Sequence, residues 1–154
     1  MNTKKILIII GIILVAGVGY WLISPLFLER SLNESLEEIV SSSSVQEKEP
    51  IVVFSGEFIG LAGHSAGGTA KVLRVGEKYY VRFEDDFKIT NGPDLFVYFG
   101  KDNQYVAEAR IDGLKGSVGS QNYEVPRGIS PENFNEIWVW CRAFAVPFGK
   151  ASLN

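Results

Sequence analysis

The sequence KYYVRFE at residues 78–84 decides the fold class, because its side chains alternate between two faces of an extended chain. The two faces are formed by Tyr79, Val81 and Phe83 and by Tyr80, Arg82 and Glu84. Gly76-Glu77 immediately before it is typical of a hairpin turn, and Thr69–Val75 supplies a second β-prone run. These residues therefore predict an antiparallel pair of strands.

Similar short runs continue on both sides of this hairpin, separated by turn residues such as Asn91-Gly92-Pro93-Asp94. The predicted strands cover residues 51–54, 56–59, 69–75, 78–84, 87–90, 95–99, 105–111, 123–125 and 136–144. No helical pattern between them is long enough for a crossover, so neighbouring strands must pair antiparallel. We therefore expect an all-β domain over 51–154, either a β-sandwich or a closed barrel of about eight or nine short strands.

The composition excludes several classes of protein. The formal net charge of -3 provides no cationic surface for nucleic acid, so we expect no nucleic-acid partner. One His, one Cys and one Met exclude zinc fingers, a CxxC redox pair, c-type haem attachment and an intrachain disulfide. Asp85, Asp86 and Asp94 lack the spacing of a calcium loop, and we expect no metal site.

The N-terminus predicts a membrane anchor. Residues 6–23 are uncharged and the apolar run reaches residue 28, which matches the roughly 20 residues that a helix needs to cross a bilayer. A cleaved signal peptide is the alternative, but bulky Tyr20 and its neighbour Trp21 stand where a cleavage site needs small residues. Lys4 and Lys5 precede the run. The positive-inside rule then predicts a single-pass signal-anchor in the cell membrane, embedded through residues 6–28, with a cytoplasmic N-terminus and an extracytoplasmic C-terminal domain.

A tether separates the predicted anchor from the predicted domain. Ser31 followed by Glu34 fits a capping box, and a short amphipathic helix is expected from about Leu32 to Val40. The serine run that follows is typical of a flexible linker. The predicted organisation is a cytoplasmic stub and transmembrane helix at 1–28, a short helix and linker at 29–50, and the β domain at 51–154.

Residues 63–67, GHSAG, match the nucleophile elbow G-x-S-x-G of α/β-hydrolases. That mechanism needs a histidine approaching the serine from elsewhere in the fold. The only histidine here is His64, which is adjacent to Ser65 in the chain and points away from it. We therefore interpret this segment as a glycine-rich loop.

Cys141 is the residue with the most distinctive chemistry. In the predicted strand at 136–144 it shares a face with Ile137, Val139 and Ala143. A lone cysteine on such a face is often a small apolar core residue. Outside the cytoplasm, however, an unpaired thiol also indicates reactivity, through a sulfenic acid or as the ligand of a prosthetic group.

Four segments of the predicted domain resemble the DM-thirteen domain family. They are GEF at 56–58 with HSAGGTA at 64–70, NGPDLFVY at 91–98, LKGSVGSQNYEVP at 114–126, and WCRAFAVPFGKASL at 140–153. The resemblance covers nearly all of 51–154 in order. It implies a β-rich domain of cell-surface proteins with a proposed role in electron transfer, and it places the family's characteristic cysteine at Cys141.

Two interpretations of the function follow. In the first, the domain acts in electron transfer or thiol redox chemistry through Cys141, bare or holding a haem or other prosthetic group, with an unknown redox or membrane-protein partner. In a haem site only His64 and Cys141 could be ligands, so their segments would have to meet. The first interpretation expects a Cys141 thiol that solvent can reach.

In the second interpretation the domain is a non-catalytic binding, adhesion or accessory module of a membrane complex, and Cys141 only packs the core. Its recognition surface would be formed by Tyr80, Tyr98, Trp138 and Trp140. It expects exposed aromatic side chains beside a buried thiol.

Overall fold

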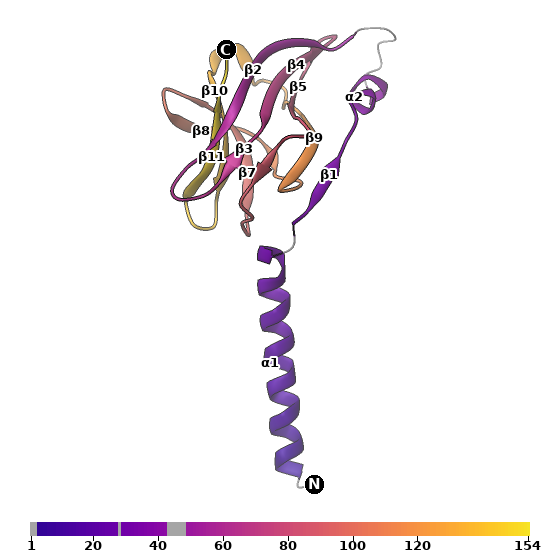
Figure 1. Ribbon diagram of the computed structural model, residues 1–154, viewed down its shortest axis with the longest axis vertical. Coiled ribbons are helices and arrows are strands. Elements are labelled where there is room, and N and C mark those ends of the chain that lie inside the picture. The colour runs from indigo at the N-terminus through magenta and orange to yellow at the C-terminus, as the bar shows by residue number, and fades with distance from the viewer. Residues whose placement is uncertain (1–2, 28, 43–48) are drawn as a thin grey trace.

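Ten β-strands follow one another from Ile51 onward in the computed structural model, which describes residues 3–27, 29–42 and 49–154 (Figure 1). Their bounds are β2 Ile51–Gly60, β3 Ala66–Gly67, β4 Thr69–Val75, β5 Lys78–Phe83, β6 Lys88–Ile89, β7 Leu95–Lys101, β8 Gln104–Gly113, β9 Val118–Glu124, β10 Glu136–Cys141 and β11 Val146–Ser152. One 3-10 turn, η1, covers Pro131–Asn133. The elements before them are α1 Thr3–Phe27, β1 Ser31–Asn33 and α2 Leu36–Ser42.

Hydrogen bonds join the strands of the described chain into one 11-stranded sheet. The strand order is β3-β6-β9-β5-β4-β2-β11-β10-β7-β8, with β1 added beside β9. Among the strand pairs that the structure describes, only β1–β9 is parallel. The predicted all-β, antiparallel fold is therefore confirmed. The closed-barrel alternative is wrong, because β3 and β8 end the strand order without pairing with each other.

Strand β2 is the corner of the sheet. Residues Ile51 to Glu57 pair with β4, whereas Phe58 to Gly60 pair with β11. The strands before and after β2 in the order thus lie on opposite sides of the domain, as in a β-sandwich (Figure 1). The sequence predicted eight or nine strands and divided β2 in two. It also missed the two-residue β3, because so short a strand carries no alternating pattern.

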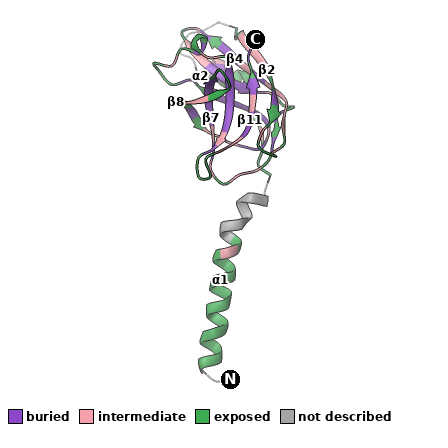
Figure 2. Cartoon of the chain, turned by 90° about the vertical axis from the view of Figure 1, so that its left-hand side faces the viewer, coloured by how far each residue is buried: buried purple, intermediate pink, exposed green. Residues whose placement is uncertain are grey.

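The core lies between the two halves of this folded sheet and takes side chains from both (Figure 2). Val81 and Phe83 are fully buried, and Tyr79 packs against the same cluster, as the alternation at residues 78–84 predicts. Phe58 and Phe87 add edge and tilted ring contacts to Phe83 at centroid distances of 4.9 and 4.5 Å. These ring contacts therefore link the corner strand to the half of the sheet that contains β5.

The helix α1 projects away from the domain, and nearly all its described side chains are exposed (Figures 1 and 2). Within the part of the chain that the structure describes, no helix is long and apolar enough to cross a membrane. The transmembrane part of the prediction is therefore not confirmed. Residues 1–2 and 28 of the predicted anchor lie outside the described residues.

The segment after α1 differs from the predicted tether. Residues Ser31–Asn33 form strand β1, and the helix begins at Leu36 instead of about Leu32. Ser31 is not its cap, because it pairs with Val118 of β9. The linker predicted from Ser41 to Pro50 is wrong at its start, because α2 extends to Ser42, and residues 43–48 of it lie outside the described residues.

Candidate functional site

Cys141 is the last residue of β10, the central strand of one half of the sheet. It pairs with Leu95 of β7 on one side and with Val146 of β11 on the other. Its side chain is 0 % exposed and packs in the core with Ile137 and Val139, as the alternation predicts. In this structure the thiol is therefore shielded from reagents in the solvent.

The chain turns directly after Cys141. Residues 142–145 form an exposed turn instead of the predicted continuation of the strand to residue 144, and Ala145 has a φ of 52°. Arg142 fixes this turn, because its backbone N–H donates to the Asp94 carbonyl at 3.0 Å and its Nε donates to the Asp94 carboxylate at 3.0 Å. The Arg142 guanidinium also lies 4.5 Å from the centre of the Phe96 ring. It is thus engaged on the outer face, away from the thiol.

The outer face of the same half carries a cluster of rings. We name Phe96, Tyr98, Tyr105 and Trp140 the outer aromatic cluster. Tyr105 stacks on Trp140 at a centroid distance of 4.2 Å and meets Tyr98 edge to face at 5.2 Å. Burial raises the pKa of the Tyr98 hydroxyl, with smaller opposing effects from nearby arginines. Trp140 and Tyr105 are half-buried, so part of the cluster faces solvent one residue away from Cys141.

The predicted recognition surface is only partly assembled. Tyr98 and Trp140 belong to the outer aromatic cluster, but Tyr80 is buried on the other half of the sheet with Ile39 of α2. Trp138 is 6 % exposed and donates its indole N–H to Glu136 at 2.9 Å. Tyr105 and Phe96 were not predicted, because their contacts with Trp140 and Arg142 join parts of the chain that are far apart in the sequence.

His64 lies in the loop between β2 and β3. Its imidazole stacks on the ring of Phe148 at a centroid distance of 3.7 Å and an angle of 11°. No hydrogen bond or ring contact within the described residues joins His64 to Cys141. Ser65 is tied to Thr90 through a backbone N–H bond to the threonine hydroxyl at 2.9 Å, and no helix follows it. The arrangement thus agrees with a loop and not with a nucleophile elbow.

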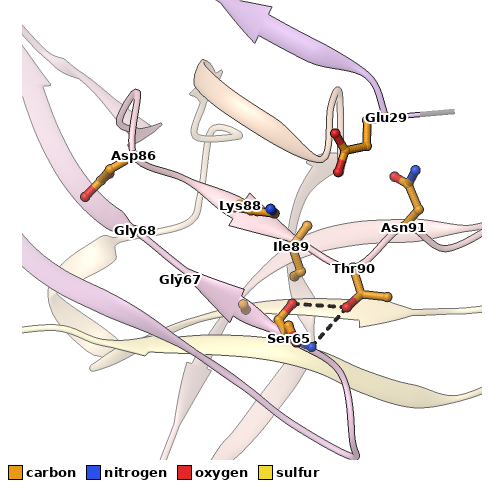
Figure 3. A pocket seen from close by; sticks show the side chains of 10 residues that line it. Glu29, Ser65, Gly67, Gly68, Asp86, Lys88, Ile89, Thr90 and Asn91 are labelled. Carbon is orange, nitrogen blue, oxygen red and sulfur yellow. Dashed lines mark hydrogen bonds between the residues drawn. The ribbon is translucent and has the colours of Figure 1, made fainter.

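A pocket of about 670 Å³ opens beside this loop (Figure 3). Its lining comprises Glu29, Ser65, Ala66, Gly67, Gly68, Asp86, Lys88, Ile89, Thr90 and Asn91. A neighbouring pocket of about 560 Å³ shares Glu29 and Asn91 with it. Cys141 lines neither pocket. Among the residues that the structure describes, no group of three or more His, Cys, Asp or Glu side chains is placed to hold a metal ion.

The structure leaves no space for a prosthetic group on Cys141. The sulfur lies among core side chains, and the two pockets described above do not reach it. Such a group would therefore have to displace part of the core, which protein interiors resist because they are close-packed.

Comparison with protein-family models gives a match over most of the β domain. The model of the family described as electron transfer DM13 matches residues 57–153, which agrees with the resemblance seen in the sequence. No curated protein and no solved structure matches the chain.

Proposed function

Because the chain belongs to the electron transfer DM13 family, which supports a general redox role, we propose that it transfers electrons through the Cys141 thiol. The observation that carries this proposal is the position of Cys141 at the end of β10, immediately before the exposed turn at 142–145. Opening of this turn would expose the sulfur while the rest of the sheet stays paired. Local openings of this kind need less free energy than global unfolding.

The chemistry in the open state is a two-electron oxidation by a peroxide. The Cys141 sulfur attacks one peroxide oxygen and the O–O bond breaks. The departing hydroxide takes the thiol proton to form water, and the sulfur becomes a sulfenic acid. A thiol of a reducing partner then condenses with the sulfenic acid to a mixed disulfide and water, and a second partner thiol releases Cys141 as the thiol. Electrons thus pass from thiols to peroxide.

The experiment is to treat the native full-length chain with hydrogen peroxide and to trap sulfenic acid with a dimedone probe. We expect the probe at Cys141 in the wild type and none in Cys141→Ala. Arg142→Ala removes the ion pair with Asp94 that holds the turn. Because an exposed ion pair contributes little, the rate of trapping should rise by up to about fivefold. Arg110→Ala is the matched control, because Arg110 also lies over the Phe96 ring but has no bond to the turn. Absence of the probe from native wild-type protein would refute the proposal.

We also propose that α1 anchors the chain in the cell membrane, with Lys4 and Lys5 on the cytoplasmic side and the β domain outside. The support is the uncharged run at residues 6–23 and the exposure of the described apolar side chains of α1. Protease added to spheroplasts should then digest the β domain. Full protection of the domain would contradict this orientation, and failure of the chain to float with vesicles would contradict the anchor.

A second candidate function is recognition of a partner protein by the outer aromatic cluster. The stacked and half-buried Tyr105–Trp140 pair beside a buried thiol favours it. A photo-crosslinking amino acid in place of Tyr105 should then capture a membrane protein, and Trp140→Ala should abolish capture without changing trapping at Cys141. Equal capture by the Trp140→Ala variant would exclude this face as the recognition surface.

A further inference from the structure

Residues 29–42, which we name the strap, are attached to the sheet before the matched family region begins (Figure 1). The Arg30 carbonyl accepts a hydrogen bond from the Ser117 N–H at 2.9 Å, and β1 then adds a parallel strand to β9. The Glu34 N–H donates to the Ser120 carbonyl at 3.0 Å. The strap thus behaves as part of the domain and not as a free linker.

Glu34 is the polar anchor of the strap. Lys115 Nζ donates to both carboxylate oxygens, at 2.9 and 3.0 Å, and the Asn122 N–H donates to one of them at 2.7 Å. The Glu34 carbonyl accepts from Arg82 at 3.1 Å and from the Ser120 hydroxyl at 2.9 Å. Arg82, Ser120 and Asn122 are all at least nine-tenths buried. The strap provides hydrogen-bond partners for the Ser120 hydroxyl and the Asn122 amide, and it adds one to Arg82, which also bonds Glu84 and Asn122.

Ile39 of α2 is the apolar anchor. It is 2 % exposed and forms a separate buried cluster with Leu73, Val75 and Tyr80 on the outer face of β4 and β5. The backbone also comes very close at Gly116, where an added Cβ would lie 2.5 Å from the Arg30 carbonyl oxygen. Two anchors and a glycine contact therefore hold the strap along its length.

From these contacts we infer that the strap is a clamp that holds the β domain at a fixed position against the end of α1. Among the described residues after α1, Arg30 is the first that is hydrogen-bonded to the sheet, and it follows Phe27, the last residue of α1, by three positions. This limits the distance between Phe27 and Arg30 to about 10 Å. A free chain over residues 28–50 would have an r.m.s. span of about 26 Å and could extend to about 75 Å. The clamp thus removes most of the reach that a tether of this length would give.

The consequence of the clamp for partner choice rests on the proposed membrane anchor. A domain held about 10 Å from the end of a membrane helix meets integral proteins of the same membrane, and not partners that are far from the bilayer. The outer aromatic cluster lies on the half of the sheet opposite β1 and β9, so the clamp leaves that half uncovered for such a protein.

The test is hydrogen exchange of the full-length chain in detergent, followed by mass spectrometry of peptides from residues 29–42. The wild-type strap should be protected, with the Glu34 amide slow. Glu34→Gln removes the charge from the Lys115 contact, and Gly116→Ala removes the space for the Arg30 carbonyl. Each should speed exchange of the strap by about tenfold or more while β7 keeps its protection.

Two matched variants control for unspecific effects. Glu37→Gln makes the same charge change at an exposed position of the strap. Gly113→Ala adds a methyl group that would meet only the Phe96 ring at 3.8 Å, an ordinary contact. Both should leave strap exchange at the wild-type rate. A wild-type strap that exchanges as fast as an unstructured peptide, or equal exchange in Glu34→Gln and Glu37→Gln, would overturn the clamp.

A second measurement tests the distance between the β domain and the bilayer. Energy transfer from a dye at the C-terminus to acceptor lipids in nanodiscs should give one narrow efficiency for the wild type and a broad distribution for Gly116→Ala. Identical broad distributions would overturn the fixed position. If the chain does not associate with lipid at all, the membrane proposal fails instead, while hydrogen exchange in detergent still decides whether the strap is clamped.

Discussion

Glu136 is the charged residue of β10, the strand that carries Cys141, and its substitution should destabilise the fold strongly. Its carboxylate is buried and accepts hydrogen bonds from Lys150 Nζ at 2.6 Å, from the Trp138 indole at 2.9 Å and from the Asn103 N–H at 3.1 Å. Glu136→Ala would leave the largely buried Lys150 ammonium group without its counter-ion, with Asn103 Oδ1 as its remaining partner, and the Trp138 indole N–H without its acceptor.

The expected loss is about 3–5 kcal/mol in the free energy of unfolding, the usual cost of removing one partner of a buried ion pair. For a domain of this size that corresponds to a fall in Tm of roughly 15–30 °C. Glu136→Gln should lose less, because the amide oxygen still accepts from Trp138. Glu136→Gln combined with Lys150→Met should recover most of the loss, since no unpaired charge remains buried.

Denaturant unfolding of the full-length chain, followed by tryptophan fluorescence, measures these differences. The matched control is Glu108→Ala, because Glu108 is exposed and its truncation should change the stability by no more than about 0.5 kcal/mol. If Glu136→Ala and Glu108→Ala unfold at the same denaturant concentration, the buried network does not stabilise the strand and the reasoning is refuted.

Two other predictions concern stability. Burial raises the pKa of the Tyr123 hydroxyl far above its ordinary value of 10.0, so the folded state keeps it neutral while the unfolded state ionises. The stability that this neutral hydroxyl contributes is complete below pH 10, and the free energy of unfolding falls by about 1.4 kcal/mol per pH unit above it. Tyr123→Phe should therefore weaken the dependence of stability on pH in the alkaline range. The same dependence in wild type and variant would argue against this. Deleting residues 1–50 removes the strap and uncovers Leu73 and Tyr80, so the truncated domain should still show a β spectrum but melt several degrees lower, and an unchanged Tm would contradict this.

Alternating side chains were sufficient to predict most of the sheet. The hairpin of β4 and β5 turns at Gly76-Glu77 as expected, and the inward face of β10 holds Ile137, Val139 and Cys141. These features depend on residues that are near one another in the chain, which a sequence pattern records directly. The end of β10 was placed too late, because residues 142–144 continue the β-prone composition although the chain turns there.

Features that depend on distant contacts could not be predicted in the same way. Strand β1 contains only Ser-Leu-Asn and forms because β9 offers it a partner about 87 residues later. Tyr105 of β8 stacks on Trp140 of β10, although β9 and η1 lie between these strands in the chain. No sequence pattern at either residue indicates this contact. His64 and Cys141 were considered together for their chemistry alone, and no contact joins them. Tertiary pairing, and not local propensity, determines all three.

Labelling of Cys141 in the native protein tests the central claim most directly. The claim is that the buried sulfur becomes reachable when the turn at residues 142–145 opens. A maleimide added to the folded full-length chain should label Cys141 completely but slowly, at least about tenfold slower than in guanidinium, with a rate that rises in Arg142→Ala and not in Arg110→Ala. A thiol that stays unlabelled in native protein over many hours, and reacts only after denaturation, would show that Cys141 is a core residue and would contradict the account.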